Sequence, residues 1–252
     1  MRTILTCSVL MLGMVSVAAA QTASVEPAAL TILNHMADNI GALHSCRFHL
    51  DAAHDVYDAE ISAMVKRHDS YDVYLVGPNK MLVNSTGDGG HRGCWYDGKT
   101  IYFYSYDENN YARVLSPPTI LAAIDSMNEA YGIDFPGADF ISPTFVKDLL
   151  TQSKRVVYRK TVEIGGKDCF HVVATGPDQD WEIWVANDAT GLPVKYVIRD
   201  KGKNSGNEYE GQFSDWQMNP DLPSTMFDFP QPPGAHEVKI LARNAKQPGG
   251  KP

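Results

Sequence analysis

The sequence predicts an α+β protein in which an antiparallel sheet of about ten or eleven strands curls into a half-open barrel. Most of the chain consists of short segments that alternate apolar and polar residues and are separated by turn residues. About three short segments have the apolar spacing of helices instead. So few helices cannot cover a flat sheet of this width. We therefore expect the sheet to curl around them, with the helices as a lid on its concave face.

Composition and charge are those of a globular protein. The chain has 252 residues, of which 44% are hydrophobic and 21% charged, with a formal net charge of -8. An acidic protein is a poor general binder of nucleic acids and of anionic lipid headgroups. We expect a single domain over residues 21–242, followed by a polar, disordered tail over residues 243–252.

The first twenty residues, 1–20, have the organisation of a secretory signal peptide. Arg2 precedes an apolar run over residues 9–17, and three alanines, 18–20, follow it. The alternative is an uncleaved membrane anchor, for which the apolar run is short. No later stretch is apolar enough to span a bilayer. Export would leave three cysteines in an oxidising compartment, forming at most one disulfide or serving as small buried hydrophobes: Cys46, Cys94 and Cys169.

The first element after the signal is a helix over residues 27–43. Pro27 suits a first helical turn, and Gly41 lies near the end. The apolar residues on one face follow helical spacing: Ile32, Met36, Ile40 and Leu43.

An up-and-down series of strands follows the helix. Asp97-Gly98, between two aromatic runs, is the strongest hairpin signal in the chain, and residues 77–79 form another turn. The strands of this first half lie within four segments: 46–68, 71–85, 94–106 and 110–115.

Two short helices then interrupt the sheet. Residues 117–131 follow Ser116, a candidate cap, and residues 143–150 begin with another Ser-Pro pair. The apolar face of the first of these helices consists of Ile120, Ile124, Met127 and Tyr131. We interpret the sequence between the two helices as a loop.

The second half of the sheet includes the hairpin 180–200, which carries a tryptophan on each face. We expect Trp184 to lie opposite Val197, and Glu182 opposite Arg199. On the outer face, Trp184 would then be covered by Lys195 and Arg199. The inner face would consist of Trp181, Ile183, Val185, Val194, Tyr196 and Ile198. The remaining strands of this half lie within 155–164, 167–175 and 207–218, and the segment 222–241 adds a last turn and a short strand.

Several segments resemble a known family over nearly the whole mature chain. The most specific are Tyr96-Asp97-Gly98-Lys99, Asp180-Trp181 with Trp184, Leu192-Pro193 and Phe227 to Ala235. They resemble an uncharacterised family of predicted periplasmic proteins, domain of unknown function 2092. Shorter motifs are similar to the lipoprotein carrier LolA and its relatives in the LolA/LolB-like superfamily: a DGKT-like hairpin, an LP-x-K strand and an F-x-F…PP-G ending. This second resemblance implies a LolA-like half-open barrel with helices as a lid over an apolar cavity, and, less directly, acyl-chain binding.

We therefore expect a periplasmic, non-enzymatic protein that binds a lipid or a lipoprotein acyl chain under the lid helices, with no cofactor. The alternative is a periplasmic interaction or scaffold protein with a filled core, whose outer sheet face contacts a periplasmic or outer-membrane protein. An enzyme is the third possibility. The cavity of the first hypothesis would be bordered by seven residues: Trp181, Ile183, Tyr196, Ile198, Ile120, Ile124 and Met127.

The motifs that carry catalysis in common enzyme families are missing from the sequence: G-x-S-x-G, H-E-x-x-H, a P-loop and G-x-G-x-x-G after a strand. His49, Asp51 and Asp55 share one face of a strand, which favours a solvated outer face over a metal site. A nucleophile pair of Cys169 and His171 would need an orienting third group and an oxyanion pocket, and the sequence indicates neither. A tyrosine cluster indicates sheet packing or, alternatively, the rim of an amphipathic ligand site: Tyr96, Tyr102, Tyr104, Tyr106 and Tyr111.

Overall fold

The computed structural model describes residues 24–202 and 206–243. The expected signal peptide, residues 1–20, lies outside the described residues, as does nearly all of the expected tail. Within the described ranges, no helix combines the length and the apolar character needed to cross a membrane.

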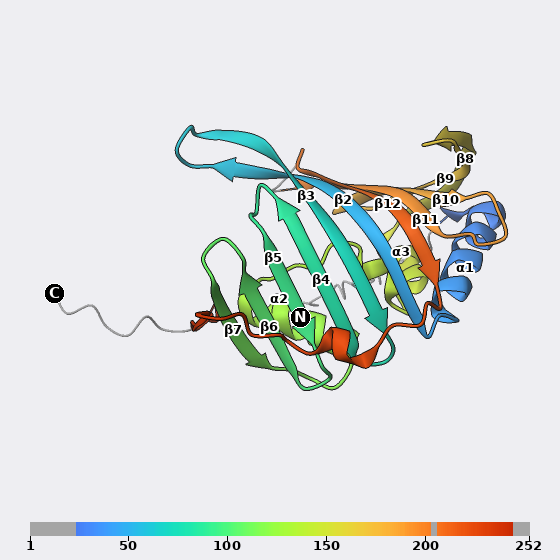
Figure 1. The fold of residues 1–252 in the computed structure, drawn as a ribbon. Helices are drawn as coiled ribbons and strands as arrows, with labels where there is room; N and C mark the ends of the chain where they lie inside the picture. Colours follow the sequence, from blue (N-terminus) through green and yellow to red (C-terminus); the bar gives the residue numbers. More distant parts are fainter. Residues whose placement is uncertain (1–23, 203–205, 244–252) are drawn as a thin grey trace, which may run out of the picture.

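The described residues form one large sheet of 13 strands that wraps around the helices (Figure 1). Its spatial order is β1-β8-β9-β10-β11-β12-β2-β3-β4-β5-β6-β7-β13. The two-residue strands β1 and β13 pair in parallel at the two edges, and the described pairs between them are antiparallel. The strands are β1 (Ser24–Val25), β2 (Ser45–Asp58), β3 (Ala63–Val76), β4 (Lys80–Gly87), β5 (Arg92–Tyr96), β6 (Thr100–Ser105), β7 (Asn110–Leu115), β8 (Arg155–Ile164), β9 (Lys167–Thr175), β10 (Gln179–Ala186), β11 (Pro193–Asp200), β12 (Glu208–Met218) and β13 (His236–Glu237).

The predicted architecture is confirmed: the sheet is open, mostly antiparallel and curled around the helices, as in a half-open barrel. The strands of the first and second halves of the chain join where β12 pairs with β2, the first strand of the long β2–β3 hairpin. This pairing makes one continuous concave surface from strands distant in sequence. The edges β1 and β13 have no strand partner on their outer side among the described residues, so the barrel stays half open.

The helices on the concave face are α1 (Pro27–Gly41), α2 (Ile120–Tyr131) and α3 (Phe145–Gln152). The first helical turn of α1 contains Pro27, as expected. Met36 and Ile40 of the expected face are buried, together with Ala29 and Leu33, whereas Ile32 and Leu43 are half-buried against the core. The N-cap of α2 is Thr119, whose hydroxyl accepts a hydrogen bond from Ala122 N. The predicted cap, Ser116, is wrong, because its N–H still bonds to Lys99 O as an extension of the sheet.

The segment between α2 and α3 is not a plain loop. Gly132 ends α2 in the left-handed conformation, with φ 69°, which glycine adopts without steric cost. A single 3-10 turn, η1 (Ala138–Ile141), then inserts Phe140 into the core, where it is 2% exposed. The absence of helical periodicity in this stretch explains why the sequence did not predict the turn.

The expected register of the β10–β11 hairpin was wrong by two residues. Trp184 lies opposite Lys195 rather than Val197, and Glu182 lies opposite Val197. The carboxylate of Asp188 accepts hydrogen bonds from Thr190 N and Gly191 N, which closes the turn early, so that Ala186 N already bonds to Leu192 O. Because side chains alternate with a period of two, a two-residue shift leaves each residue on its expected face.

A β-bulge moves one residue, Val194, to the opposite face of the sheet from the one expected. The register shifts between Trp184 and Val185, and Val194 then packs on the outer face instead of the expected inner face. It forms a small outer cluster with Cys169 and Ala186, against which Trp184 packs.

The C-terminal segment covers the outer face of β4 to β7 (Figure 1). Its 3-10 turn, η3 (Ser224–Phe227), buries Phe227, which is 1% exposed, and Phe229 stacks on Tyr102 at 5.0 Å between ring centroids. Tyr104 and Tyr111 also contact Phe229. Tyr102, Tyr104 and Tyr111 therefore pack the sheet, whereas Tyr106 is exposed and stacks on His91. Tyr96 belongs to the inner core, where its hydroxyl donates to Pro117 O.

Candidate functional site: two adjacent cavities under the lid

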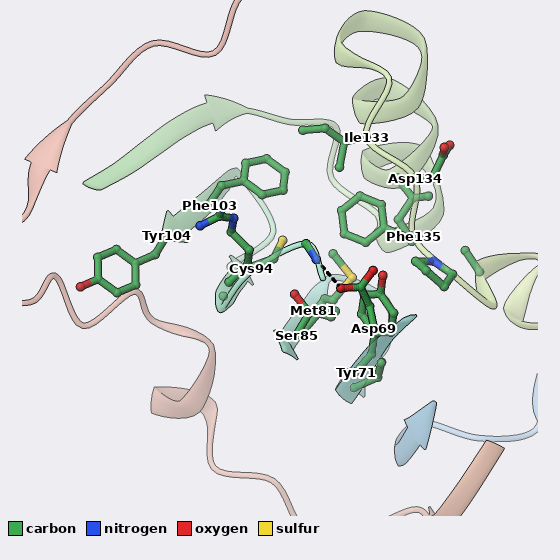
Figure 2. Close-up of a pocket in the computed structure, with 18 of the residues that line it drawn as sticks. Asp69, Tyr71, Met81, Ser85, Cys94, Phe103, Tyr104, Ile133, Asp134 and Phe135 are labelled. Carbon is green, nitrogen blue, oxygen red and sulfur yellow. Dashed lines mark hydrogen bonds between the residues drawn. The ribbon is translucent and has the colours of Figure 1, made fainter. Parts of the chain in front are cut away.

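A cavity of about 520 Å³ lies between the inner face of β3 to β7 and the lid formed by α2 and the segment 133–141. We call it the apolar cavity. Figure 2 shows Cys94 and Phe103 pointing from the strands toward Ile133 and Phe135 of the lid. Its apolar lining residues are Phe48, Tyr71, Val73, Leu75, Met81, Val83, Cys94, Phe103, Ala112, Ile124, Ile133, Phe135, Ile141, Val238 and Ile240.

The alternation of residues in each strand produces this apolar wall. In β4, Met81 and Val83 face the cavity, whereas Leu82 faces the outer cluster beneath the C-terminal segment. In β5, Cys94 faces the cavity and Trp95 faces outward. Because β4 and β5 place apolar side chains on both faces, their inner face is apolar although helices cover only part of it.

Polar residues line one end of the apolar cavity. They lie where β4 ends, β5 begins and β6 turns into β7, and these strand ends are next to one another in the sheet. Asp69, on β3, accepts a hydrogen bond from Gly89 N at this end (Figure 2). The cavity thus has an apolar interior and a polar end, a combination found in sites for amphipathic ligands.

A second cavity, of about 880 Å³, lies on the other side of the lid segment 134–138. We call it the acidic cavity. Its wall is shared with the apolar cavity through Ile124 and the segment 134–138. Seven of its described lining residues carry a carboxylate: Asp55, Asp125, Asp134, Asp139, Asp148, Asp200 and Glu208.

The seven predicted site residues do not share one cavity. Ile124 lines both main cavities, and Tyr196 and Ile198 line the acidic cavity. Ile120 lines a third cavity, of about 430 Å³, and Trp181 a small one of about 90 Å³. Ile183 and Met127 are fully buried in the core and line none of these cavities. Participation of the seven residues in ligand binding remains a prediction.

Aromatic side chains occupy part of the space above the inner face of β10 and β11, beside the acidic cavity. Phe140 of η1 lies 5.1 Å from Tyr196 and 6.5 Å from Trp181 between ring centroids. Phe145 of α3 lies 5.9 Å from Trp181. These contacts explain why the larger apolar opening lies over β3 to β7, which the sequence did not single out. The apolar alternation of residues 71–83 and 94–103 was the available signal.

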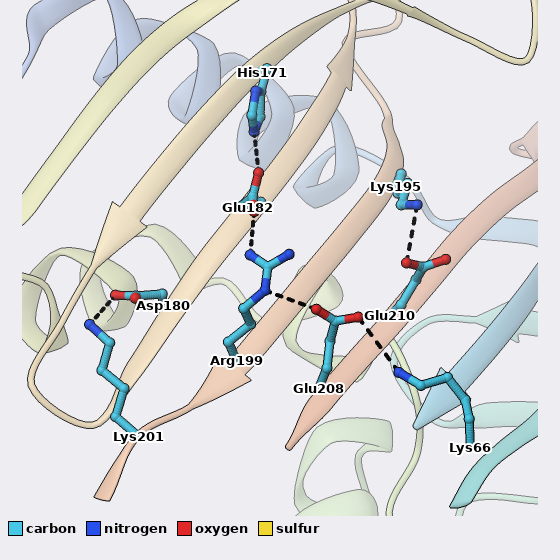
Figure 3. Close-up of polar contacts among 9 residues, drawn as sticks. All are labelled: Lys66, His171, Asp180, Glu182, Lys195, Arg199, Lys201, Glu208 and Glu210. Atoms are coloured by element: carbon cyan, nitrogen blue, oxygen red, sulfur yellow. Dashed lines mark hydrogen bonds and ion pairs between the residues drawn. The ribbon is translucent and has the colours of Figure 1, made fainter. Parts of the chain in front are cut away.

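The outer face of β9 to β12 carries a line of alternating charges (Figure 3). The imidazole of His171 lies 2.8 Å from Glu182, which also accepts from Arg199, and Arg199 Nε donates to Glu208 at 2.8 Å. Burial opposes ionisation of Glu182, but the hydrogen bonds from Arg199 and His171 outweigh it and lower the pKa of its carboxyl. Lys66 extends the line by pairing with both Glu208 and Asp55.

Trp184 is half-buried on this outer face, as expected. Lys195 Nζ lies 5.7 Å from the centroid of its ring, and the imidazole of His171 stacks on it at 4.5 Å. The second expected cover, Arg199, was wrong, because its guanidinium bonds to Glu182 and Glu208 instead. His171 takes its place.

The residues considered for other chemistry have structural roles. His49 contacts Asp51 and Asp72, whereas Asp55 bonds to Glu208 N and Lys66, so the three residues on that strand do not converge. Within residues 24–202 and 206–243, no group of three potential ligands could hold a metal ion.

Cys169 donates to Lys167 O, and burial raises the pKa of its thiol, which disfavours the thiolate. Its candidate partner, His171, bonds to Glu182. The three cysteines of the described chain, Cys46, Cys94 and Cys169, are buried and free.

Comparison with solved structures agrees with the architecture. LprF from Mycobacterium bovis is 15% identical, with a TM-score of 0.50, over 79% of this chain and 98% of LprF. The lipoprotein LppX from Mycobacterium tuberculosis is 16% identical, with a TM-score of 0.50, over 79% of this chain and 99% of LppX. A LolA superfamily protein from Nitrosomonas europaea is 14% identical, with a TM-score of 0.36, over 80% and 97% of the two chains. At such identities the likeness concerns the fold alone, and LprF and LppX share the half-open barrel architecture that the sequence predicts.

A search of curated proteins gave no match. Residues 29–241 match the family described as "Predicted periplasmic protein (DUF2092)", which is most of the described chain and includes both cavities. The resemblance inferred from the sequence motifs is thereby confirmed. The chain belongs to the DUF2092 family of predicted periplasmic proteins.

Proposed function

We propose that this protein binds and carries a hydrophobic ligand, a lipid or a lipoprotein acyl chain, in the apolar cavity, without catalysing a reaction. The observation that carries this proposal is the cavity itself, about 520 Å³ with an apolar wall and one polar end. That volume is typical of pockets for small ligands. Apolar surface facing water costs about 25 cal/mol per Å², and an acyl chain in the cavity would remove part of that cost.

The lid supports the same proposal. Ile133 and Phe135 follow α2 directly, are half-buried, and lie between the helix and the apolar cavity. Ile133 N bonds to Met127 O, so the backbone of this residue is anchored while its side chain faces the cavity (Figure 2). A ligand in the apolar cavity would therefore contact Ile133 without displacing the helix.

Binding of a neutral fluorescent probe such as Nile red tests the proposal. Ile133→Asp replaces an apolar contact by a charge, and we expect the probe affinity to fall by about tenfold or more. The matched control is Ile164→Asp, which changes the same half-buried residue type on the outer face. Failure of the wild-type protein to bind any apolar probe, or equal losses in both variants, would contradict the proposal.

A second candidate, a periplasmic scaffold with a filled core, is favoured by the aromatic packing over β10 and β11. In this case the outer face with the charge line from His171 to Lys66 would contact a periplasmic or outer-membrane protein (Figure 3). The probe measurement separates the two candidates, because a scaffold needs no apolar ligand.

The proposed location is the periplasm, reached through a cleaved signal peptide at residues 1–20. The family description and the sequence pattern both support it. N-terminal sequencing of the exported protein should begin at Gln21. A membrane-bound form that retains Arg2 would contradict cleavage.

A further inference from the structure

The last described residues run from the sheet edge at β7 to the lid helix α2. We call residues 238–243 the strap, and Figure 1 shows this end of the chain beside β7. At the sheet, Val238 N donates to Tyr111 O at 2.7 Å, directly after the parallel pairing of β13 with the start of β7. At the lid, Arg243 N donates to Ala130 O of α2 at 2.8 Å. The strap therefore joins the sheet to the lid.

The strap is also part of the wall of the apolar cavity. Val238 and Ile240 line this cavity. Ala112 of β7 and Ile124 of α2 line it too, on the two sides that the strap joins. Leu241 does not line it and is 69% exposed, as expected for a neighbouring residue in an extended segment. The strap therefore closes the apolar cavity between β7 and α2, at the open edge of the half barrel.

The two ends of the strap are held unequally. At the sheet, two ladder residues of β13 precede it, and Glu237 also accepts a hydrogen bond from Arg113 at 2.8 Å. At the lid, the bond from Arg243 N is its one backbone bond to α2 within the described chain, where the N–H groups of residues 239–242 donate to no backbone group. The Arg243 guanidinium lies over Gly132, and a Cβ at this glycine would overlap it. Segments with few hydrogen bonds and few buried contacts open locally while the rest of a protein stays folded, so the α2 end needs less free energy to open.

We propose that the strap is the gate of the apolar cavity: it is hinged at β13, its α2 end opens, and the ligand enters and leaves between β7 and α2. Closure then places Val238 and Ile240 against the ligand and removes apolar surface from water. This inference rests on the proposed function and adds the route of the ligand. The alternative route is the polar end of the cavity, where an apolar tail would pass the charged groups of Asp69 and Arg92 and displace their water.

Cross-links at the two ends of the strap test the inference. The first variant, Ala130→Cys/Arg243→Cys, ties the α2 end, where the backbone hydrogen bond is compatible with the roughly 4.4–6.8 Å that a disulfide spans between Cα atoms. The control variant, Tyr111→Cys/Glu237→Cys, ties the hinge. There the two residues are register partners, and the Tyr111 hydroxyl lies 3.5 Å from the Glu237 carboxylate. None of the four residues lines the apolar cavity, and the native cysteines of the described chain are buried.

Stopped-flow mixing with Nile red measures the exchange rates, and mass spectrometry verifies each disulfide. We expect the oxidised α2 cross-link to slow association and dissociation about tenfold or more relative to its reduced form. The dissociation constant should stay unchanged, because the strap is closed in both the free and the bound protein. The oxidised hinge cross-link should exchange the probe as its reduced form does.

A pair of proline variants tests the same point without a cross-link. Arg243→Pro removes the N–H that bonds to Ala130 O, and we expect both exchange rates to rise about fivefold. The matched control is Leu241→Pro, because Leu241 N donates to no backbone group in the described chain. This control should exchange the probe as the wild type does.

Equal rates in the oxidised and reduced forms of the verified α2 cross-link would overturn the gate and leave the polar end as the route. Equal rates in the two proline variants would overturn it as well, and they decide alone if the α2 cross-link does not form. Slowing by the hinge cross-link alone would show that the strap opens at β7 and overturn the assigned hinge. Failure of the wild-type protein to bind the probe would overturn the proposed function instead.

Discussion

Phe140 is the residue through which the lid is anchored to the sheet, and its truncation gives the most informative stability measurement. The ring is 2% exposed and contacts one aromatic ring of α3 and three rings of the strands β10, β11 and β12. Ring centroids lie between 4.8 and 6.5 Å away, at Phe145, Trp181, Tyr196 and Phe213. Truncation of a buried phenylalanine to alanine costs about 3–5 kcal/mol, and aromatic pairs add to the loss beyond buried area.

We therefore expect Phe140→Ala to lower the free energy of unfolding by about 4 kcal/mol. For a domain of this size, that corresponds to a Tm decrease of about 10 °C. Urea unfolding followed by the fluorescence of the four tryptophans measures the effect, with an unchanged m-value as the sign of two-state behaviour. The control is Phe229→Ala, where the ring is only half-buried under the C-terminal segment, and a smaller loss is expected.

A loss below about 1 kcal/mol for Phe140→Ala would refute the reasoning. It would show that η1 is held by other contacts, or that the aromatic cluster above β10 and β11 is loosely packed. The same variant should also weaken Nile red binding, because Ile141 and Phe140 belong to one 3-10 turn and Ile141 lines the apolar cavity.

Three further outcomes are expected. Gly211→Ala should cost about 1–3 kcal/mol, because the added Cβ would lie 2.3 Å from Tyr196 Cε1; wild-type stability in urea would contradict this contact. Glu182→Gln should cost about 1–2 kcal/mol at pH 7. Because the pKa of this carboxyl is lowered on folding, the difference should be complete above about pH 4.3 and be lost as the pH falls through the lowered pKa, and a pH-independent difference would count against the ion pairs. Burial raises the pKa of Cys46 and Tyr71 to about 12, so the stability that their protonated forms contribute is fully present below about pH 8.5 and is lost as the pH rises. Equal unfolding free energies at pH 7 and about pH 10.5 would contradict this expectation.

The sequence predicted the fold because its two strongest signals act locally. Alternation placed Trp181 and Ile183 inside and Trp184 outside, and a register error of two residues could not change those faces. The error itself came from the side chain of Asp188, whose hydrogen bonds shorten the turn. The displacement of Val194 came from a β-bulge, which no periodic pattern reports.

The site was less predictable because it depends on what fills the barrel. Phe140 lies in a stretch without helical or strand periodicity, and its insertion between η1 and the sheet decides which half of the concave face is closed. Ile124 was correctly placed on the lid face, whereas Ile183 and Met127 became fully buried core residues. The acidic cavity joins carboxylates from both halves of the chain, Asp55 and Asp200 among them, which are brought together only by the pairing of β12 with β2.

Lipid extraction from the natively purified, exported protein tests the central claim most directly. Mass spectrometry of the extract should show an amphiphile at close to one molecule per protein chain, and Ile133→Asp should lose it while Ile164→Asp retains it. An extract with no bound amphiphile from wild-type protein, together with a solved structure in which side chains fill the space between β3 to β7 and the segment 133–141, would contradict the carrier function.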